Sequence, residues 1–326
     1  MNLLKKLTSV NAPSGHEKNL HEIIINELKD FADETNTDAL GNLIIHKAGN
    51  GKKLMLAAHA DEIGIIVTYI EENGLLRFGN VGGVRAAYAL AQRVVFTNGT
   101  HGVVYYDKSK DIEKLSINDM YIDIGAKDRN EAQKLVGIGD MACFEGEFIE
   151  QGECIISKAL DDRCGIYVLI EALKRAKCSP NDVYAVFTAQ EELGLRGAKA
   201  SAYNINPDIA IAIDVTDTGD LPGATAMAVS MGGGAAIKIK DSSIISSKYV
   251  VDLLKKTATE NNIAYQLEVL THGGTDAGAI HTMRGGTKTA TLSLPTRYIH
   301  SPGEMINKSD IESCISILQK VIEQTL

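Results

Sequence analysis

The stretch Val183-Tyr184-Ala185-Val186-Phe187-Thr188 runs directly into Ala189-Gln190-Glu191-Glu192-Leu193-Gly194. The first six residues are apolar, aromatic or β-branched, which predicts a buried strand, and the closing glycine predicts a turn behind it. We therefore expect Glu191 and Glu192 at the carboxyl end of a strand, where open α/β sheets bind ligands. Neighbours on an extended chain point to opposite sides, so the two carboxylates can have different roles. A solvated pair of loop carboxylates is the alternative interpretation.

Apolar runs and amphipathic segments alternate on both sides of this stretch. Further buried strands are predicted at 42–45, 53–58, 208–213 and 289–294, and helices at 17–32, 165–177, 249–258 and 309–323. Ser14, three residues before Glu17, predicts a capping box at the start of the first helix. Strands that alternate with helices predict an α/β domain with a mostly parallel central sheet flanked by helices.

The region between residues 67 and 152 has a different pattern. Short apolar runs there are separated by turn signals such as Asn73-Gly74, Gly82-Gly83 and Asn98-Gly99. Short strands at this spacing predict a small β barrel or sandwich. We therefore expect a catalytic α/β domain made of residues 1–66 and 153–326, with a β domain inserted at 67–152.

Composition excludes several classes of partner. The chain has 326 residues, a formal net charge of −9 and no long basic run, so we expect neither nucleic acid nor an anionic membrane surface as a partner. No apolar stretch approaches the ~20 residues that span a bilayer. The N-terminus lacks an apolar signal core, which predicts a cytoplasmic protein. The chain has 5 cysteines, an odd number, and no Cys-x-x-Cys pair, so a metal site would use histidine and carboxylates.

Potential metal ligands follow four of the predicted strands, and a further pair precedes a helix. They are His59 with Asp61, Glu191 with Glu192, Asp214, His300, and Asp161 with Asp162. Imidazole and carboxylate groups are ligands that zinc and cobalt accept. Two-metal hydrolytic sites also need a bridging group between ions ~3.5–4 Å apart. Two histidines and three carboxylates from this set would satisfy that requirement.

Each of these signals also has a structural interpretation. A histidine at a strand end is more often a surface or satisfied core residue, and an Asp-Asp pair before a helix can be a cap. Asp61 lies on the same face as His59 and could orient its ring. The turn Gly273-Gly274-Thr275 could hold substrate main chain or simply begin a helix. The remaining histidines have no comparable setting and are interpreted as structural: His16, His21, His46, His101, His272 and His281.

Seven stretches together resemble the M42-type metallo-aminopeptidases, in the right order and over nearly the whole chain. They are 13–15 (PSG), 59–64 (HADEIG), 157–163 (SKALDDR), 189–198 (AQEELGLRGA), 212–216 (AIDVT), 273–277 (GGTDA) and 297–302 (RYIHSP). Two places depart from the family pattern: the stretch from Gly83 to Ala91, and Gly303. These departures concern substrate preference and assembly rather than the metal ligands.

The resemblance implies a three-layer α/β/α di-zinc peptidase fold, with an inserted β domain that mediates dimerisation. It implies two divalent cations per subunit, Zn²⁺ or Co²⁺ with Mn²⁺ as a further candidate. The implied ligands are Asp161 as the bridge, His59 and Asp214 on one metal, and Glu192 and His300 on the other. It assigns Glu191 as general base and Asp61 as a carboxylate that orients a ligand without binding metal itself. It also implies a cis peptide bond at Asp161–Asp162.

The implied activity is removal of the N-terminal residue from peptides with a free N-terminus, by metal-activated water. Gly274 and Thr275 are the candidates for substrate binding. The resemblance also implies self-association as dimers, which in this family build twelve-subunit tetrahedral particles. Three alternatives stay open: an endoglucanase-like glycoside hydrolase, a di-metal deacylase or carboxypeptidase using Arg297 or Arg163, and a non-enzymatic metal-binding scaffold. The absence of tryptophan argues against the first.

Overall fold

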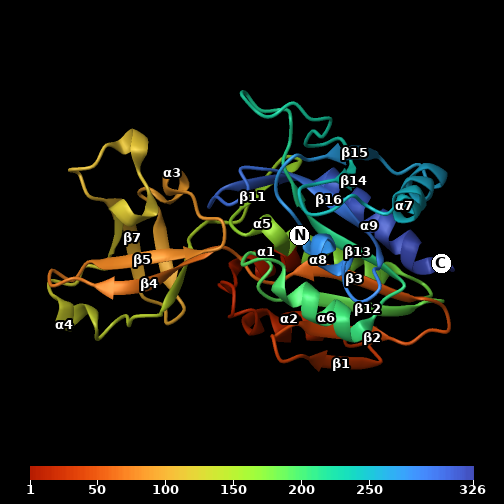
Figure 1. Ribbon diagram of the computed structural model, residues 1–326, viewed down its shortest axis with the longest axis horizontal. Coiled ribbons are helices and arrows are strands. Elements are labelled where there is room, and N and C mark those ends of the chain that lie inside the picture. Colours follow the sequence, from red (N-terminus) through yellow and green to blue (C-terminus); the bar gives the residue numbers. More distant parts are fainter.

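The stretch around Val186 forms an interior strand of a large sheet in the computed structural model, which describes residues 1–326 (Figure 1). The strand order is β1 (Glu34–Thr37), β2 (Leu43–Lys47), β12 (Asp182–Thr188), β3 (Lys53–His59), β13 (Ile209–Thr216), β16 (Lys288–Arg297), β17 (Glu304–Asn307), β11 (Cys154–Ser157) and β10 (Ile149–Gln151). Strand β14 (Ala235–Lys240) also pairs with β16, and β15 (Tyr265–Val269) pairs with β14.

The middle of this sheet is parallel, as predicted. Strands β12, β3, β13 and β16 are parallel neighbours, and so are β14 and β15. The pairs at both flanks are antiparallel, so the complete sheet is mixed. Since parallel strands share a direction, β12, β3, β13 and β16 present their carboxyl ends at one edge.

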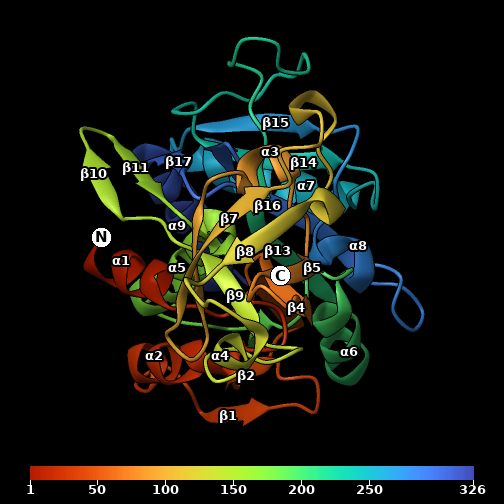
Figure 2. The same cartoon turned by 90° about the vertical axis from the view of Figure 1, so that its left-hand side faces the viewer.

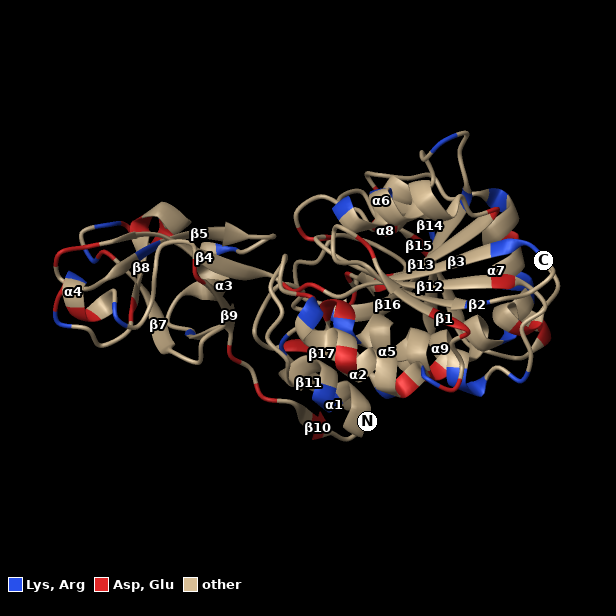
Figure 3. Cartoon of the chain, turned by 90° about the horizontal axis from the view of Figure 1, so that it is seen from below, with Lys and Arg blue, Asp and Glu red and all other residues tan.

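Helices cover both faces of the sheet (Figure 3). Residues of α1 (Asn2–Ser9), α2 (Lys18–Leu28), α5 (Leu160–Arg175), α7 (Lys248–Glu260) and α9 (Lys308–Glu323) share one large core cluster. Residues of α6 (Arg196–Ile205) and α8 (Asp276–Ile280) belong to a second cluster. In β3, Leu54 and Leu56 pack into the first cluster and Met55 and Ala57 into the second. Burial on both faces explains why this strand is apolar almost throughout.

A separate β barrel follows β3 and stands beside the carboxyl edge of the sheet (Figures 1 and 2). Its strands close in the order β4 (Gly64–Ile70), β5 (Leu76–Val81), β8 (Met120–Asp123), β7 (His101–Tyr106), β6 (Arg93–Phe96) and β9 (Met141–Phe144). It also contains the short helices α3 (Ala86–Ala89) and α4 (Arg129–Ala132), two 3₁₀ turns (Ile112–Lys114 and Ile117–Asp119), and its own core cluster.

These findings confirm the predicted α/β fold with a small inserted barrel. The barrel strands lie within residues 64–144, whereas β10 at Ile149–Gln151 pairs with β11 in the large sheet. The barrel strands therefore begin at Gly64, before the predicted boundary at residue 67, and end at Phe144, before the predicted boundary at residue 152. The division of the chain into independent domains at 67 and 152 stays a prediction.

The capping box predicted at Ser14 and Glu17 is wrong. The Ser14 hydroxyl donates to Asp61 Oδ2 at 2.6 Å, and the Glu17 carboxylate accepts the amides of Gly15 and Gln190 at 2.7 and 3.0 Å. Both side chains thus bind segments outside helix α2. The local pattern could not reveal this, because Asp61 and Gln190 are distant in the sequence.

Candidate metal centre

The predicted ligands meet at the carboxyl edge formed by the four parallel strands. His59 is the last residue of β3, and Asp214 lies inside β13. Glu191 and Glu192 follow the end of β12, and His300 follows the end of β16. Parallel pairing of these strands therefore assembles residues that are distant in the sequence.

Asp161 contributes from outside the sheet, at the start of α5. Its two carboxylate oxygens face two different histidines: Oδ1 lies 2.8 Å from His59 Nε2, and Oδ2 lies 3.3 Å from His300 Nε2. The peptide bond between Asp161 and Asp162 is cis, as the resemblance implied. Asp161 is therefore the one candidate ligand placed between the two histidines.

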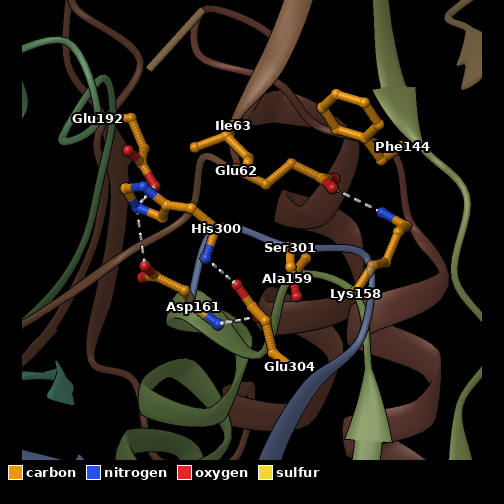
Figure 4. A pocket seen from close by; sticks show the side chains of 10 residues that line it. All are labelled: Glu62, Ile63, Phe144, Lys158, Ala159, Asp161, Glu192, His300, Ser301 and Glu304. Carbon is orange, nitrogen blue, oxygen red and sulfur yellow. Dashed lines mark hydrogen bonds and ion pairs between the residues drawn. The ribbon is translucent and has the colours of Figure 1, made fainter. Parts of the chain in front are cut away.

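Two groups of candidate ligands share Asp161. In the first group, the ligand atoms of His59, Asp161 and Asp214 all lie within 4.8 Å of one another. In the second group, the ligand atoms of Asp161, Glu192 and His300 do so (Figure 4). Within the second group, Glu192 Oε1 is 3.1 Å from His300 Nε2. Glu191 belongs to neither of these two groups, but it forms a third group with His59 and Glu192, whose ligand atoms also lie within 4.8 Å of one another.

Asp61 is fully buried behind the ligands and holds the Glu191–Glu192 loop. Its carboxylate accepts the backbone amides of Glu191 and Glu192 at 3.0 and 3.2 Å, as well as the Ser14 hydroxyl. The ring of His59 contacts the same residue, with Nδ1 3.1 Å from the Asp61 carbonyl oxygen and 3.5 Å from its carboxylate. The carboxylate expected to orient the ring therefore mainly positions the neighbouring loop.

Burial and crowding change the proton affinities of these groups. Burial raises the pKa of Asp214 and of Glu191 well above the usual carboxylic range, and nearby carboxylates raise both further. Burial alone would lower the pKa of His300, but its hydrogen bonds with Asp161 and Glu192 outweigh this and raise it to about 12. The raised pKa values of all three groups indicate that several carboxylates are packed together with few positive charges nearby.

A divalent cation would relieve this crowding. Imidazole nitrogens and carboxylate oxygens at these separations are a donor set that suits zinc, cobalt or manganese. Each group offers one histidine, one carboxylate of its own and a share of Asp161. The residues therefore fit a metal in each group.

The His300 ring is oriented from the barrel side. His300 Nδ1 lies 3.2 Å from the carbonyl oxygen of Gly83, in the loop that follows β5. When Nδ1–H donates to this oxygen, Nε2 faces Asp161 and Glu192. A Cβ atom at Gly83 would lie only 2.5 Å from Nδ1, so this close approach requires glycine. The barrel thus contacts the second group directly.

Three further carboxylates around the ligands have roles that the sequence did not predict. Asp162 Oδ2 accepts the amide of His59 at 3.2 Å, and Glu304 accepts the amides of Asp161 and His300 at 3.0 and 2.9 Å. Asp276 is buried and accepts the Thr188 hydroxyl at 2.5 Å, and burial raises its pKa to about 6. Asp162 and Asp276 stood within recognised motifs, whereas no local pattern marked Glu304.

The predicted substrate-binding residues belong to neither of the two groups. Thr275 is buried, with its hydroxyl 2.9 Å from that of Thr291. Gly274 is exposed, and a Cβ atom added to it would lie 3.1 Å from Ser243 Oγ. Neither residue belongs to a ligand group or lines the pocket beside Asp161. Thr275 precedes α8 as its N-cap, which favours the helix-entry interpretation of this turn.

The six histidines interpreted as structural join no ligand group. His46 lies 2.7 Å from Asp182, His272 lies 3.0 Å from Asp217, and His101 binds Glu145. These three histidines therefore pair with carboxylates outside the ligand groups, and His46 also lies 3.7 Å from Glu34. The two arginines considered for a substrate carboxylate are also already paired. Arg297 donates to Asp220 at 3.3 and 2.7 Å, and Arg163 is fully buried against Glu62.

None of the helices is both long enough and apolar enough to cross a membrane.

Comparisons with known proteins agree over nearly the whole chain. The family model described as M42 glutamyl aminopeptidase matches residues 41–317. A putative aminopeptidase of Acetivibrio thermocellus is 52% identical over 321 residues, which cover 98% of this chain and 97% of that protein. A solved aminopeptidase from the archaeon Desulfurococcus kamchatkensis has a TM-score of 0.95 and 38% identity, covering 99% and 94% of the two chains. The Pyrococcus horikoshii TET1 peptidase, which can assemble into a tetrahedron or a large octahedral shell, has a TM-score of 0.88 and 35% identity, covering 98% of each chain.

Proposed function

The chain belongs to the M42 glutamyl aminopeptidase family and is an aminopeptidase, and we propose that it works with two divalent cations and with Glu191 as general base. The observation that carries this proposal is the position of Asp161, which turns one carboxylate oxygen to each histidine. That arrangement suits a carboxylate shared between two ions.

His59 and Asp214 would hold one ion, Glu192 and His300 would hold the other, and Asp161 would bridge them. Zinc, cobalt or manganese bound there would polarise the scissile carbonyl and lower the pKa of water toward ~7.

Glu191 would move the proton. Its backbone amide is held by Asp61, and its carboxylate lies beside both groups without belonging to either Asp161-containing group. Burial raises the pKa of Glu191 well above the usual carboxylic range. We propose that Glu191 accepts a proton from the attacking water and delivers it to the leaving amine.

The competing activities have weaker support. A carboxypeptidase needs a cation directed at the substrate carboxylate, and both Arg297 and Arg163 are occupied by carboxylates of the chain itself. A carbohydrate site commonly uses stacking aromatic residues, and the chain has no tryptophan. A metal-binding scaffold has no need of a general base, and neither group around Asp161 includes Glu191.

Aminoacyl-p-nitroanilides test this function directly. The full-length protein should hydrolyse them after loading with Zn²⁺, Co²⁺ or Mn²⁺, lose activity on chelation, and regain it when metal is restored. An N-acetylated version of the best substrate is the matched control and should be inert. Release of C-terminal residues, or chelator-resistant cleavage of a glucan, would contradict the proposal.

We further propose that the protein acts in the cytoplasm and self-associates through the barrel as dimers that can build a twelve-subunit tetrahedron. Support comes from the assembly of the TET1 peptidase and from apolar side chains on the barrel surface, with Ile138 67% and Leu135 43% exposed. Sedimentation of the Leu135→Asp/Ile138→Asp variant should give a smaller particle than the wild type. An unchanged sedimentation coefficient would remove these residues from the proposed contact.

A further inference from the structure

Glu304, the first residue of β17, joins two segments that carry candidate ligands. Its carboxylate accepts the backbone amide of Asp161 on Oε2 at 3.0 Å and that of His300 on Oε1 at 2.9 Å (Figure 4). Glu304 is 2% exposed, so water does not replace these bonds readily. One side chain therefore fixes the backbone at both residues.

These two residues lie outside the regular sheet. Asp161 has non-helical dihedral angles within the first turn of α5, whose N-cap residue Ala159 has a φ of +53°. His300 itself has a φ of +64°. Such left-handed conformations are unfavourable for a non-glycine residue, so they persist only where surrounding contacts hold them. Glu304 provides such a contact for both segments.

The side chains of the same two residues meet in the second group. His300 Nε2 is 3.3 Å from Asp161 Oδ2, and both lie near Glu192. We propose that Glu304 is a positioning residue that sets the separation of Asp161 and His300 and thereby tunes cation binding in the second group. This inference rests on the two-cation site proposed above.

Buried carboxylates also accept the backbone amides of other residues at the candidate metal centre. Asp61 accepts the amides of Glu191 and Glu192, and Asp162 accepts the amide of His59. In each case a buried carboxylate outside the candidate ligand set holds the backbone of a residue inside it. Glu304 differs because it lies in a third segment and accepts the amides of two candidate ligands, Asp161 and His300, that are far apart in the sequence.

A carboxylate suits this task better than a carboxamide. Each carboxylate oxygen of Glu304 accepts one backbone amide, whereas glutamine has one acceptor oxygen and would direct its NH₂ at the other N–H. Glu304→Gln therefore keeps the size and loses one of the two bonds. Glu304→Asp keeps the charge but is one methylene shorter, so it cannot reach both amides. Comparing the two variants separates the positioning of the backbone from the effect of a nearby negative charge.

Asp310 offers a matched control. It is also fully buried, and it accepts the amides of Gly232 and Gly234, both at 2.7 Å, in a segment that carries no candidate ligand. Asp310→Asn should weaken a two-amide contact of the same kind without touching the metal groups.

The experiment is calorimetric titration of metal-free full-length protein with CoCl₂, combined with the melting temperature of each metal-free variant. Wild type should bind two Co²⁺ ions per chain. Glu304→Gln and Glu304→Asp should both bind one ion within about threefold of the wild-type affinity and the other ion about 10–100-fold more weakly. Asp310→Asn should lower the melting temperature and leave both affinities unchanged.

Each other result has a defined meaning. Wild-type affinities in Glu304→Asp would overturn the inference, because charge alone would then suffice. Equal losses at both ions, or the same loss in Asp310→Asn, would reduce Glu304 to a general structural role. If Glu304→Gln does not fold, Glu304→Asp alone decides between these outcomes. Binding of fewer than two ions by the wild type would instead reject the two-cation site itself.

Discussion

The two halves of the candidate metal centre are positioned in different ways. His59 and Asp214 lie within strands β3 and β13, and the His59 side chain is 2% exposed. Glu192 and His300 lie on loops beyond β12 and β16, and the His300 side chain is 28% exposed. Strand register therefore places the first pair, whereas the second pair depends on contacts made by its loops.

These loop contacts come from buried carboxylates and from the barrel. Asp61 holds Glu192, Glu304 holds His300, and the Gly83 carbonyl faces the His300 ring. A ligand in a strand gains its position from the hydrogen-bond ladder, but a ligand on a loop needs dedicated acceptors to reach a comparable position. We expect the loop-borne half to be the more easily perturbed one.

The largest effect should come from the residue that both halves share. Asp161→Ala removes a ligand from each group, so both cations should be lost and kcat/KM should fall by at least ~10⁴-fold. Elemental analysis after gel filtration measures the metal content, with circular dichroism as the control for folding. Two retained ions would show that Asp161 is not the shared ligand.

The next effect concerns proton transfer and should spare both halves. Glu191→Gln should keep both cations and the melting temperature, while kcat falls by ~10²–10⁴-fold because the general base is missing. Metal content and p-nitroanilide turnover, measured on the same preparation, check this. Turnover close to that of the wild type would assign the base to another group.

A smaller effect should separate the two halves by their kinetics. Because His300 is more exposed than His59, a chelator should remove one cation at least about tenfold faster than the other. His300→Ala should abolish the fast phase and leave the slow one. Stopped-flow chelation with a chromogenic chelator resolves the two phases, and a single phase for two ions in the wild type would contradict the asymmetry.

The smallest effect is expected outside both halves. Arg297 pairs with Asp220, and the two side chains are 23% and 27% exposed. Arg297→Met should therefore change the free energy of unfolding by less than about 1 kcal/mol and kcat/KM by less than about threefold. Urea unfolding and p-nitroanilide kinetics measure the two quantities. A drop in kcat/KM above tenfold would give Arg297 a part in substrate binding.

Much of the fold was predictable because its signals are local. Apolar runs such as 53–58 and 208–213 identify strands buried on both faces, and the polar residues directly after or within them identify the edge that carries chemistry. The short runs and turn signals between residues 67 and 152 likewise indicate a barrel. The strands β14, β15 and β17 and the helices α1, α6 and α8 were not predicted, and none of them is longer than 10 residues, so each contains few repeats of a helical or strand pattern.

The sequence by itself determined the kind of fold and the residues able to bind metal, since both depend on side-chain chemistry at nearby positions. Only the tertiary structure decided how those residues are held. In the folded chain the Ser14 hydroxyl donates to Asp61 instead of capping a helix, and the carbonyl of Gly83 in the barrel region contacts the His300 ring. The tertiary structure also gave Glu304 the amides of Asp161 and His300. Contacts of this kind join distant segments through strand order and loop conformation, and neither is encoded in any one stretch of the chain.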